Sequence, residues 1–253
     1  MSNEFLIGIN SVEAALSHDA GNIVELFIEP GSHNARVKAI SDRARELGIK
    51  PHARDRQALD RMTGGARHQG VVAHYKAPVP LGEDDLAKLV ADSGRDALFL
   101  VLDGVTDPHN LGACLRSAEA AGVTAVIVPK DRAVGITPIV RRASAGAADR
   151  VPLVVATNLA RTLRALKGAG VWLVGLVADE SPVLHETALD GPLTIVMGSE
   201  GEGLRRLTRE ACDFLAYIPL RGQVDSLNVS VATGIALFEV LRQRRVSATP
   251  CSG

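Results

Sequence analysis

From residue 97 onward, short apolar runs alternate with segments of helical spacing. Six runs are almost continuously hydrophobic: 97–105, 124–129, 151–156, 171–177, 193–198 and 214–220. Strands that are apolar on both faces are typical of a parallel sheet covered by helices on two sides. Stretches such as "NLARTLRALKGAG" between them repeat apolar residues at helical spacing. The pattern therefore predicts an α/β domain with a parallel sheet over 97–245.

A smaller α/β pattern precedes it in residues 1–75. Its expected elements are two strands and two helices, at 23–29, 34–48, 54–62 and 70–75. Asn34 is the expected N-cap of the first helix, because its side chain can accept a hydrogen bond from the first turn, and Gly48 is the expected stop. The chain is therefore expected to form an N-terminal domain over 1–75 and a larger C-terminal domain.

Two segments have neither pattern. Residues 76–96 combine prolines, a glycine and an acidic helical patch, and they predict a linker between the domains. Residues 246–253 are small and polar, and they predict a flexible tail.

The composition narrows the class of protein. Basic and acidic residues number 28 and 29, so binding to nucleic acid must come from a local patch of charge. The three cysteines lie far apart without a CxxC pair, which indicates a reducing compartment and no zinc site. The run at 97–102 is far shorter than the roughly 20 apolar residues that span a bilayer, and the N-terminus has no signal-peptide pattern. A cytoplasmic protein without a membrane segment is expected.

Ligands of open parallel sheets bind beyond the carboxyl ends of the strands, so the residues after each apolar run are candidates for a site. After the first run, Asn110 can cap the next helix, and Arg116 lies six residues later. Taken separately, Asn110 is explained as a helix cap and Arg116 as a solvated surface residue. Their occurrence in one strand-end segment favours a site.

The segment after 193–198 is rich in glycine. Gly198, Gly201 and Gly203 surround Glu200, and glycines let the backbone approach a ligand closely or adopt positive φ. Their spacing differs from the GxGxxG of dinucleotide-binding proteins, and no GK[ST] of a phosphate-binding loop is present. A tight strand-to-helix turn explains the glycines equally well.

The third segment, "SLNVSVATGIALFE", opens a helix with two polar residues, Ser226 and Asn228. One of them can cap the helix while the other faces the crevice at the strand ends. The three segments together offer an arginine, amides, a carboxylate and a hydroxyl, which suit an anionic, hydroxyl-rich substrate such as an RNA backbone. His109 is the one histidine near them and the sequence has no cluster of metal ligands, so a Ser-His-Asp hydrolase and a metal site are not expected.

The same three segments resemble the signature motifs of one family. "LDGVTDPHNLGACLRSAEAAGV" (102–123), "IVMGSEGEGL" (195–204) and "IPLRGQVDSLNVSVATGIALFEVLRQR" (218–244) are similar in order, spacing and strand context to the SpoU (TrmH-like) branch of the SPOUT RNA methyltransferases. "INSVEAAL" (9–16) and "HQGVVAHY" (68–75) resemble the small N-terminal α/β (L30e-like) domain of members that act on 23S rRNA. The resemblance implies an N-terminal RNA-binding domain and a C-terminal SPOUT domain whose last part is threaded into a deep trefoil knot, an exception to the usual absence of knots.

The resemblance also implies a reaction and a site. The reaction is methyl transfer from S-adenosylmethionine to the 2′-oxygen of a guanosine ribose in 23S rRNA. Gly198, Ile218 and Leu227 are implied as cofactor-binding residues. Arg116 is implied to act on the ribose hydroxyl, either as a deprotonated base or as a cation beside the developing alkoxide. The residues implied to position it are Asn110, Glu200, Ser226 and Asn228.

The partners implied are 23S rRNA and a second copy of the chain, in a homodimer that forms through the knotted region with Arg116 beside the partner's surface. Residues 1–75 hold nine basic and nine acidic residues, but the stripe 50–68 holds five basic and two acidic ones. A local basic stripe can bind phosphate without net charge on the domain. A solvated helix face is the alternative interpretation of the stripe.

Three other functions are compatible with parts of the pattern. A nicotinamide-dependent dehydrogenase would need a glycine fingerprint after its first strand, which "LDGVTDPHNLG" lacks. A non-catalytic RNA-binding or ribosome-assembly protein of this fold would have no reason to keep the whole polar set. A tRNA ribose methyltransferase would share the catalytic segments, and the resemblance of the N-terminal domain favours rRNA over tRNA.

Overall fold

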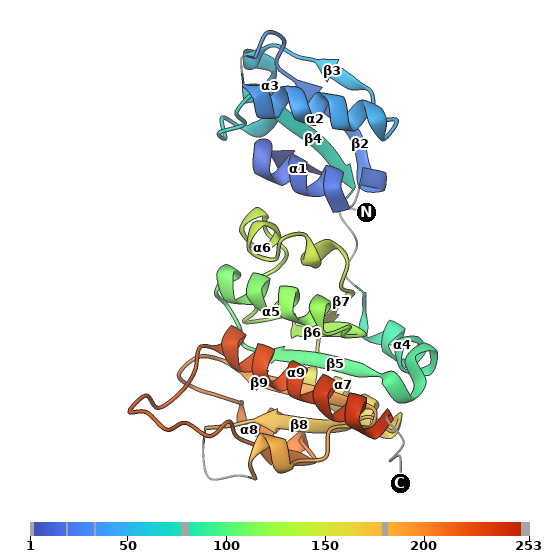
Figure 1. Ribbon diagram of the computed structural model, residues 1–253, viewed down its shortest axis with the longest axis vertical. Helices are drawn as coiled ribbons and strands as arrows, with labels where there is room; N and C mark the ends of the chain where they lie inside the picture. The colour runs from blue at the N-terminus through green and yellow to red at the C-terminus, as the bar shows by residue number, and fades with distance from the viewer. Residues whose placement is uncertain (1–2, 19, 33, 77–80, 179–181, 249–253) are drawn as a thin grey trace. The chain divides into compact units, whose positions relative to one another are not determined.

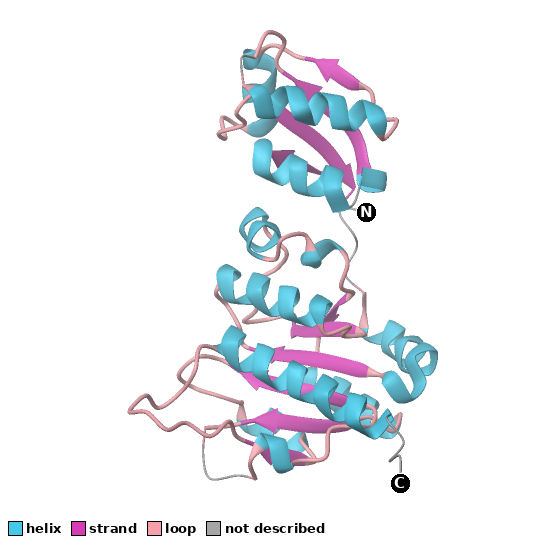
Figure 2. Cartoon of the chain, viewed as in Figure 1, coloured by secondary structure: helices cyan, strands magenta, loops and turns pink. Residues whose placement is uncertain are grey.

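The chain folds into two compact units in a computed structural model, Met1–Val79 and Pro80–Gly253. The structure describes residues 3–18, 20–32, 34–76, 81–178 and 182–248. Figures 1 and 2 show that each unit has its own sheet with helices packed on it.

The N-terminal unit is a four-stranded mixed sheet with helices on both faces. The strand order is β1-β4-β2-β3, with β1 and β2 antiparallel to β4 and β3 parallel to β2. Alternate residues of β4 enter different cores, because successive side chains of a strand point to opposite faces. Val71 and Ala73 pack in the core that α1 and α2 cover, and Val72 packs with Leu59 of α3. The elements are β1 (Asn3–Ile7), α1 (Ile9–His18), η1 (Ala20–Asn22), β2 (Ile23–Ile28), α2 (Ala35–Glu46), β3 (Pro51–Ala53), α3 (Arg56–Thr63) and β4 (Val71–Lys76).

The local signals read from the sequence of this unit are confirmed. Asn34 caps α2, and its Oδ1 accepts a hydrogen bond from the Arg36 N–H at 3.0 Å. Gly48 follows the last turn of that helix with φ of +79°, a conformation that glycine adopts at little cost. The strand and helix expected at 23–29 and 54–62 correspond to β2 and α3.

The C-terminal unit contains a six-stranded sheet in which every neighbouring pair is parallel, as predicted. The strand order is β10-β8-β9-β5-β6-β7. The strands are β5 (Leu98–Asp103), β6 (Ala125–Pro129), β7 (Leu153–Ala156), β8 (Trp172–Leu176), β9 (Leu193–Gly198) and β10 (Phe214–Ala216). The α-helices are α4 (Leu86–Ser93), α5 (Pro108–Ala120), α6 (Pro138–Ala143), α7 (Leu159–Gly168), α8 (Arg206–Ala211) and α9 (Val229–Ala248). Short 3-10 turns lie at Glu83–Asp85, Gly94–Asp96, Ala147–Asp149 and Leu184–Glu186.

Helices cover both faces of this sheet, which explains why its strands are apolar throughout. Leu98, Leu100 and Leu102 of β5 pack in one core with α5 and α9. Phe99 and Val101 of the same strand pack in the other core with α4 and α7. After the edge strand β10, the chain returns to the middle of the sheet, where α9 packs on α5 and β9 (Figure 1). This return places the start of α9 near the carboxyl ends of β5 and β9.

The segment predicted as a linker, 76–96, belongs in large part to the C-terminal unit. Leu81 pairs with β7 through two main-chain hydrogen bonds, to Leu153 O at 2.8 Å and from Val155 N at 3.0 Å. Leu86 is buried in the core beside α7. Of the predicted tail, residues 246–248 form the last turn of α9, and residues 249–253 lie outside the described residues.

No helix in the described ranges is long and apolar enough to cross a membrane.

Glu83 holds the segment that was predicted as a linker against α7. Its carboxylate accepts hydrogen bonds from the hydroxyls of Thr157 and Thr162 and from the guanidinium of Arg161. These donors, Thr157 first, favour the charged form and lower the pKa of Glu83 to about 2 from its ordinary 4.5.

We therefore expect Glu83→Gln to change how stability depends on pH. A carboxyl whose pKa is lowered in the folded state stabilises it above the unfolded pKa, and this stabilisation is lost as pH falls through the folded pKa. The wild type should exceed the variant in melting temperature most above about pH 5. The difference should shrink between pH 4.5 and about 2. Melting curves of both proteins across pH 2–7 measure it, and a difference that is constant with pH would contradict the assignment.

Candidate active site

Three segments meet at the carboxyl ends of the central strands. The first follows β5 and opens α5, the second follows β9, and the third connects β10 to α9. Because β5 and β9 are hydrogen-bonded neighbours, the register places Asp103 beside Gly198, so the first two segments leave the sheet side by side. In Figure 1 the third segment, drawn in orange-red, reaches outward beyond the strand ends before α9 begins. These are the three segments that the sequence singled out.

The glycines after β9 are required by backbone packing. Ser199 and Gly203 form two main-chain hydrogen bonds, Ser199 N to Gly203 O at 3.1 Å and Gly203 N to Ser199 O at 3.0 Å. A Cβ at Gly198 would lie 2.1 Å from the carbonyl carbon of Gly203, so no other residue fits there. Gly201 adopts φ of +87° at the tip of the turn. The turn explanation is therefore correct for the glycines, and the turn it builds presents Glu200.

Asn110 is not the cap of α5. The helix begins at Pro108 with Asp107 as N-cap, whose side chain accepts a hydrogen bond from the His109 N–H at 2.8 Å. Proline fits the first helical position because its φ is fixed and it lacks an N–H to satisfy, and it moves the helix start ahead of the predicted one. Asn110 therefore lies within the first turn, 9% exposed, and its amide is available for a longer-range contact.

Asn228 performs both tasks that the sequence divided between two residues. Its Oδ1 accepts hydrogen bonds from the N–H of Ser230 at 2.9 Å and from its hydroxyl at 2.6 Å, which caps α9. Its Nδ2 donates to Asn110 Oδ1 at 3.0 Å and to Glu200 Oε1 at 2.6 Å. Ser226 is exposed and belongs to the segment before the helix.

The three side chains form a closed triangle around one carboxylate oxygen. Glu200 Oε1 accepts from Asn110 Nδ2 at 3.1 Å, from Asn228 Nδ2 at 2.6 Å and from the Val229 N–H at 3.4 Å. Hydrogen bonds to a charged group are stronger than those between neutral groups. The triangle, which we call the Glu200 triangle, therefore ties the starts of α5 and α9 to the turn after β9.

A cavity of about 830 Å³ lies beside the triangle. Pockets for small ligands span roughly 300–1,000 Å³. All three residues predicted to bind a cofactor, Gly198, Ile218 and Leu227, line it, as do Glu200 and Ser226. The rest of the lining includes apolar residues such as Leu176, Met197 and Leu220, the acidic residues Glu202 and Asp225, and one basic residue, Arg209.

The cavity wall also offers unused main-chain groups. Ile218 and Leu227 are half-buried, and their N–H and C=O groups form no hydrogen bond with any other residue that the structure describes. Polar backbone groups that are partly buried usually find a partner. The site can therefore bind a ligand that presents hydrogen-bonding edges to the backbone and apolar faces to the side chains of Leu176 and Met197.

Arg116 lies outside the Glu200 triangle. It is an exposed residue of α5, and within the described part of the chain no residue forms a hydrogen bond or ion pair with it. Its neighbour Ser117 faces α9, where the Ser117 hydroxyl oxygen is 3.7 Å from the position that a Cβ at Gly234 would take. One chain therefore assembles Asn110, Glu200 and Asn228 and leaves the guanidinium of Arg116 free.

One ion pair at the site was not predicted. Asp103, at the end of β5, is 1% exposed and accepts a hydrogen bond from Arg205 Nε at 2.6 Å. This pair holds the segment after the glycine turn against β5, and Asp103 Oδ2 has no partner among the described residues. Asp103 directly follows six apolar residues in the sequence, and this was the signal that could have identified it. A carboxylate buried at such a position must be paired or bind a ligand.

The two cysteines within the described ranges, Cys114 and Cys212, take no part in the site. Burial raises the pKa of the Cys114 thiol to about 11 and of the Cys212 thiol to about 12, so neither is a thiolate nucleophile at neutral pH. No group of His, Cys, Asp and Glu among the residues described could hold a metal ion.

Comparisons with known proteins cover both units. Residues 97–238 match the SpoU rRNA Methylase family, and residues 5–81 match a domain described as RNA 2′-O ribose methyltransferase substrate binding. The chain is 53% identical to the 23S rRNA (guanosine-2′-O-)-methyltransferase RlmB of Xylella fastidiosa, over 96% of this chain and 97% of that protein. It is 50% identical to the protein of the same name from Photobacterium profundum, over 97% and 100%. The AdoMet-bound rRNA methyltransferase from Sinorhizobium meliloti superposes with a TM-score of 0.70 at 26% identity, covering 95% of this chain and 87% of that one.

The double task of Asn228 can be separated by substitution. Asn228→Ala removes the cap and the donors to Glu200, and we expect it to lower the free energy of unfolding by about 2 kcal/mol. Asn228→Ser keeps a good capping side chain and removes only the donors, so it should lower the free energy by about 1 kcal/mol. Urea unfolding of the two variants measures the difference, and equal losses would show that Asn228 does not cap α9.

Proposed function

The chain belongs to the SpoU rRNA Methylase family, and on that premise we propose that it transfers a methyl group from S-adenosylmethionine to the 2′-oxygen of a guanosine in 23S rRNA. The observation that carries the proposal is the cavity, which the segments after β9 and β10 line beside the Glu200 triangle. The relatives named as 23S rRNA methyltransferases align with almost the whole chain, N-terminal unit included. This coverage supports rRNA rather than tRNA as the substrate.

The cavity suits S-adenosylmethionine. Ile218 and Leu227 offer main-chain groups to the adenine edge, and the apolar wall offers contact to its faces. The cavity is lined by three carboxylates, of Glu200, Glu202 and Asp225, against one guanidinium, of Arg209, and this excess of negative charge favours a ligand with a positive sulfonium. When bound, this cofactor supplies an electrophilic methyl group on sulfur. The role of Gly198 is to let the turn after β9 close on the cavity without a side chain in the way.

Arg116 is the residue proposed to act on the ribose. A 2′-hydroxyl is a weak acid, so the charge that develops on its oxygen during transfer must be stabilised. An exposed guanidinium is a cation in water, and the free state of Arg116 in one chain leaves it available to an RNA phosphate and the adjacent 2′-oxygen. We favour this cationic role over that of a base. The Glu200 triangle and Ser226 then position the segments between which the ribose and the cofactor meet.

The N-terminal unit is proposed to bind the rRNA. Residues 5–81 match a substrate-binding domain of RNA 2′-O ribose methyltransferases. The unit has its own sheet and cores, so it can hold RNA without contributing to the cofactor cavity. With this role the protein works in the cytoplasm, where rRNA is modified.

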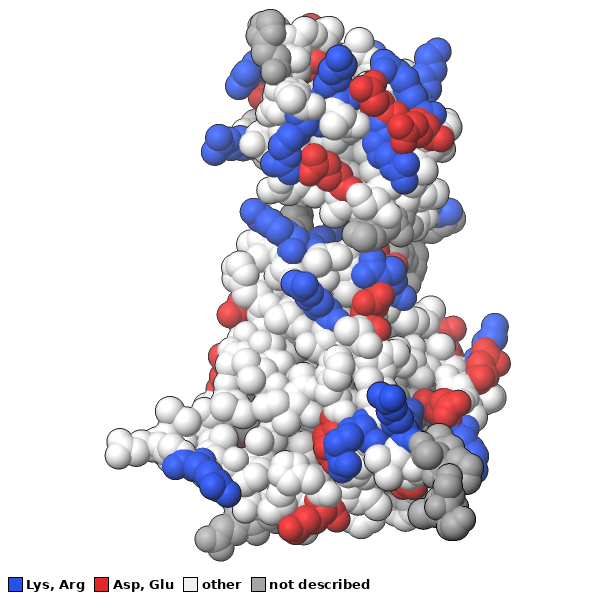
Figure 3. All heavy atoms as spheres, viewed as in Figure 1, with Lys and Arg blue, Asp and Glu red and all other residues white. Residues whose placement is uncertain are grey.

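A homodimer is proposed to form through α9 and α5. Val231, Ile235 and Phe238 are spaced four and three residues apart on α9 and are 50%, 39% and 52% exposed, which makes an apolar stripe. In Figure 3 the surface over α5 and the first half of α9 carries few charged side chains. Contiguous exposed apolar surface of this kind is typical of an interface, and a twofold dimer buries the same patch on both chains. The dimer would place Arg116 beside the partner subunit. There it would lie next to the segment between β10 and α9, which is threaded into a knot in this family.

Arg116→Ala tests the catalytic proposal. Loss of the charge beside the oxygen should reduce methyl transfer to 23S rRNA by 100-fold or more, on the order of removing one oxyanion donor. Binding of S-adenosylmethionine, measured by calorimetry, should stay within about twofold, because Arg116 does not line the cavity. Arg164→Ala, which removes an exposed arginine from α7, is the control and should keep full activity. Near-normal methylation by Arg116→Ala would refute the role.

Phe238→Glu tests the dimer. A carboxylate in the centre of an apolar interface is desolvated without a partner, so we expect a monomer by light scattering and a large loss of methyl transfer. Phe214→Glu is the matched control, because Phe214 is 47% exposed but lies on β10 beside Trp172, away from the stripe. A Phe238→Glu protein with the mass of the wild type would exclude this interface.

A further inference from the structure

The basic stripe of the N-terminal unit carries uncompensated positive charge. Its five cations are Lys50, Arg54, Arg56, Arg61 and Arg67, and none of them forms an ion pair with a residue in the described ranges. Both carboxylates of the stripe are engaged elsewhere. Asp55 caps α3 by accepting from the Ala58 N–H at 2.7 Å, and Asp60 Oδ1 lies 3.1 Å from His68 Nε2. The stripe is therefore not a self-neutralised helix face.

The opposite holds for the three arginines of α2 in the same unit, although Lys38 of that helix forms no ion pair with a described residue. Arg36 pairs with Glu13, Arg43 with Glu46 and Arg45 with Asp42. Figure 3 shows blue and red side chains next to one another over α2. The exposed arginines of α2 are thus paired with carboxylates, and the exposed arginines around α3 are not. This contrast marks the α3 side as a surface for an anion.

A hollow of about 430 Å³ lies on that side, between α3 and the loop that leads to β4. We call it the α3 hollow; its lining residues are Arg56, Asp60, Gly65, Ala66, Arg67, His68 and Gln69. Two of the unpaired cations, Arg56 and Arg67, are therefore at its wall together with a carboxylate. A site of this size accommodates one nucleotide rather than a length of duplex.

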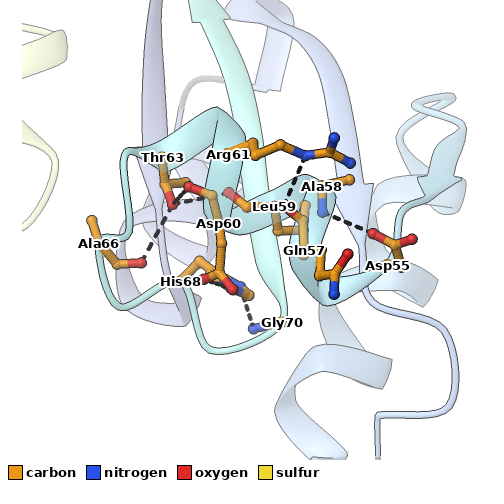
Figure 4. Close-up of polar contacts among 10 residues, drawn as sticks. All are labelled: Asp55, Gln57, Ala58, Leu59, Asp60, Arg61, Thr63, Ala66, His68 and Gly70. Atoms are coloured by element: carbon orange, nitrogen blue, oxygen red, sulfur yellow. Dashed lines mark hydrogen bonds and ion pairs between the residues drawn. The ribbon is translucent and has the colours of Figure 1, made fainter.

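The loop around the hollow is held in a defined shape. The buried His68 accepts a hydrogen bond from the Gly70 N–H on Nδ1 at 3.1 Å, so its hydrogen lies on Nε2 and is donated to Asp60 (Figure 4). Gln69 has φ of +54°, a conformation that is strained for a residue other than glycine. No described residue accepts a hydrogen bond from the main-chain N–H of Arg67 or Gln69. A rigid loop with free N–H groups beside two arginines is suited to a phosphate.

We propose that the α3 hollow binds one unpaired nucleotide of the rRNA substrate. The phosphate lies against Arg56 and Arg67, and the base enters the hollow, where the free oxygen of Asp60 accepts a hydrogen bond from a base N–H. Proteins read single-stranded RNA through bases that are splayed out into pockets, whereas duplex RNA is held along its wide minor groove. The proposal rests on the proposed function, because it names where the rRNA is gripped apart from the nucleotide that is methylated.

The test compares two double variants that each remove two arginines from this unit. Arg56→Ala with Arg67→Ala empties the hollow of its cations, and Arg43→Ala with Arg45→Ala removes the paired arginines of α2. Binding of the full-length proteins to a labelled 23S rRNA transcript is measured between 50 and 300 mM salt. For the first variant we expect affinity to fall about tenfold and the salt slope to decrease by about 1.4, since each phosphate contact on a single strand contributes about 0.7. The α2 variant should stay within about twofold of the wild type.

Two further arms define the ligand and the hollow. A single-stranded oligoribonucleotide should displace the labelled rRNA from the wild type better than a duplex of equal length. Ala66→Trp, which adds bulk at an exposed position of the hollow, should weaken binding without changing the melting temperature. Equal losses in both double variants, equal competition by the duplex, or full affinity in Ala66→Trp would each overturn the proposal. Wild-type protein that binds the transcript but never methylates it would instead refute the proposed function.

Discussion

A single carboxylate oxygen determines whether the site exists. Glu200 Oε1 receives donors from Asn110 and Asn228, which are 118 residues apart in the chain, and from the first N–H of α9. The pairing of β5 with β9 ends at Asp103 and Gly198, and beyond these residues no sheet hydrogen bond in the described chain joins the three segments, so the triangle supplies the link there. The charge of Glu200 is satisfied by neutral amides rather than by a cation, which keeps negative charge at the edge of the cavity.

The sequence predicted the framework well because its signals are local. Continuous apolar runs identify strands buried on both faces, and Asn34 and Gly48 mark the ends of α2 through contacts within a few residues. The exact residue at which α5 begins was harder to predict. Asp107 and Asn110 are both capping residues, and Pro108 decides between them only through its own conformation.

The tertiary contacts could not be predicted in this way. The sequence placed Glu200 among glycines, but its partners lie at 90 and 28 residues' separation, and no local pattern relates them. Asp103 and Arg205 are likewise joined only by the neighbouring positions of β5 and β9 in the sheet. For Arg116 the proposed role came from the family resemblance, because the guanidinium is exposed on α5 and no described residue forms a hydrogen bond or ion pair with it. In the proposed dimer, the partner would supply the surface that Arg116 lacks in the single chain.

Asn228 also links the start of a helix to the assembly of the candidate site. Aspartate and serine could begin the helix, but neither has the amide hydrogens that reach Asn110 and Glu200, and glutamine is one methylene too long for the cap. The same side chain thus caps α9 and completes the Glu200 triangle. During synthesis on the ribosome, the Glu200 triangle cannot close until Asn228 and the start of α9 have emerged after Asn110 and Glu200. A copy cut short before Asn228 therefore lacks two of the three donors to Glu200 Oε1.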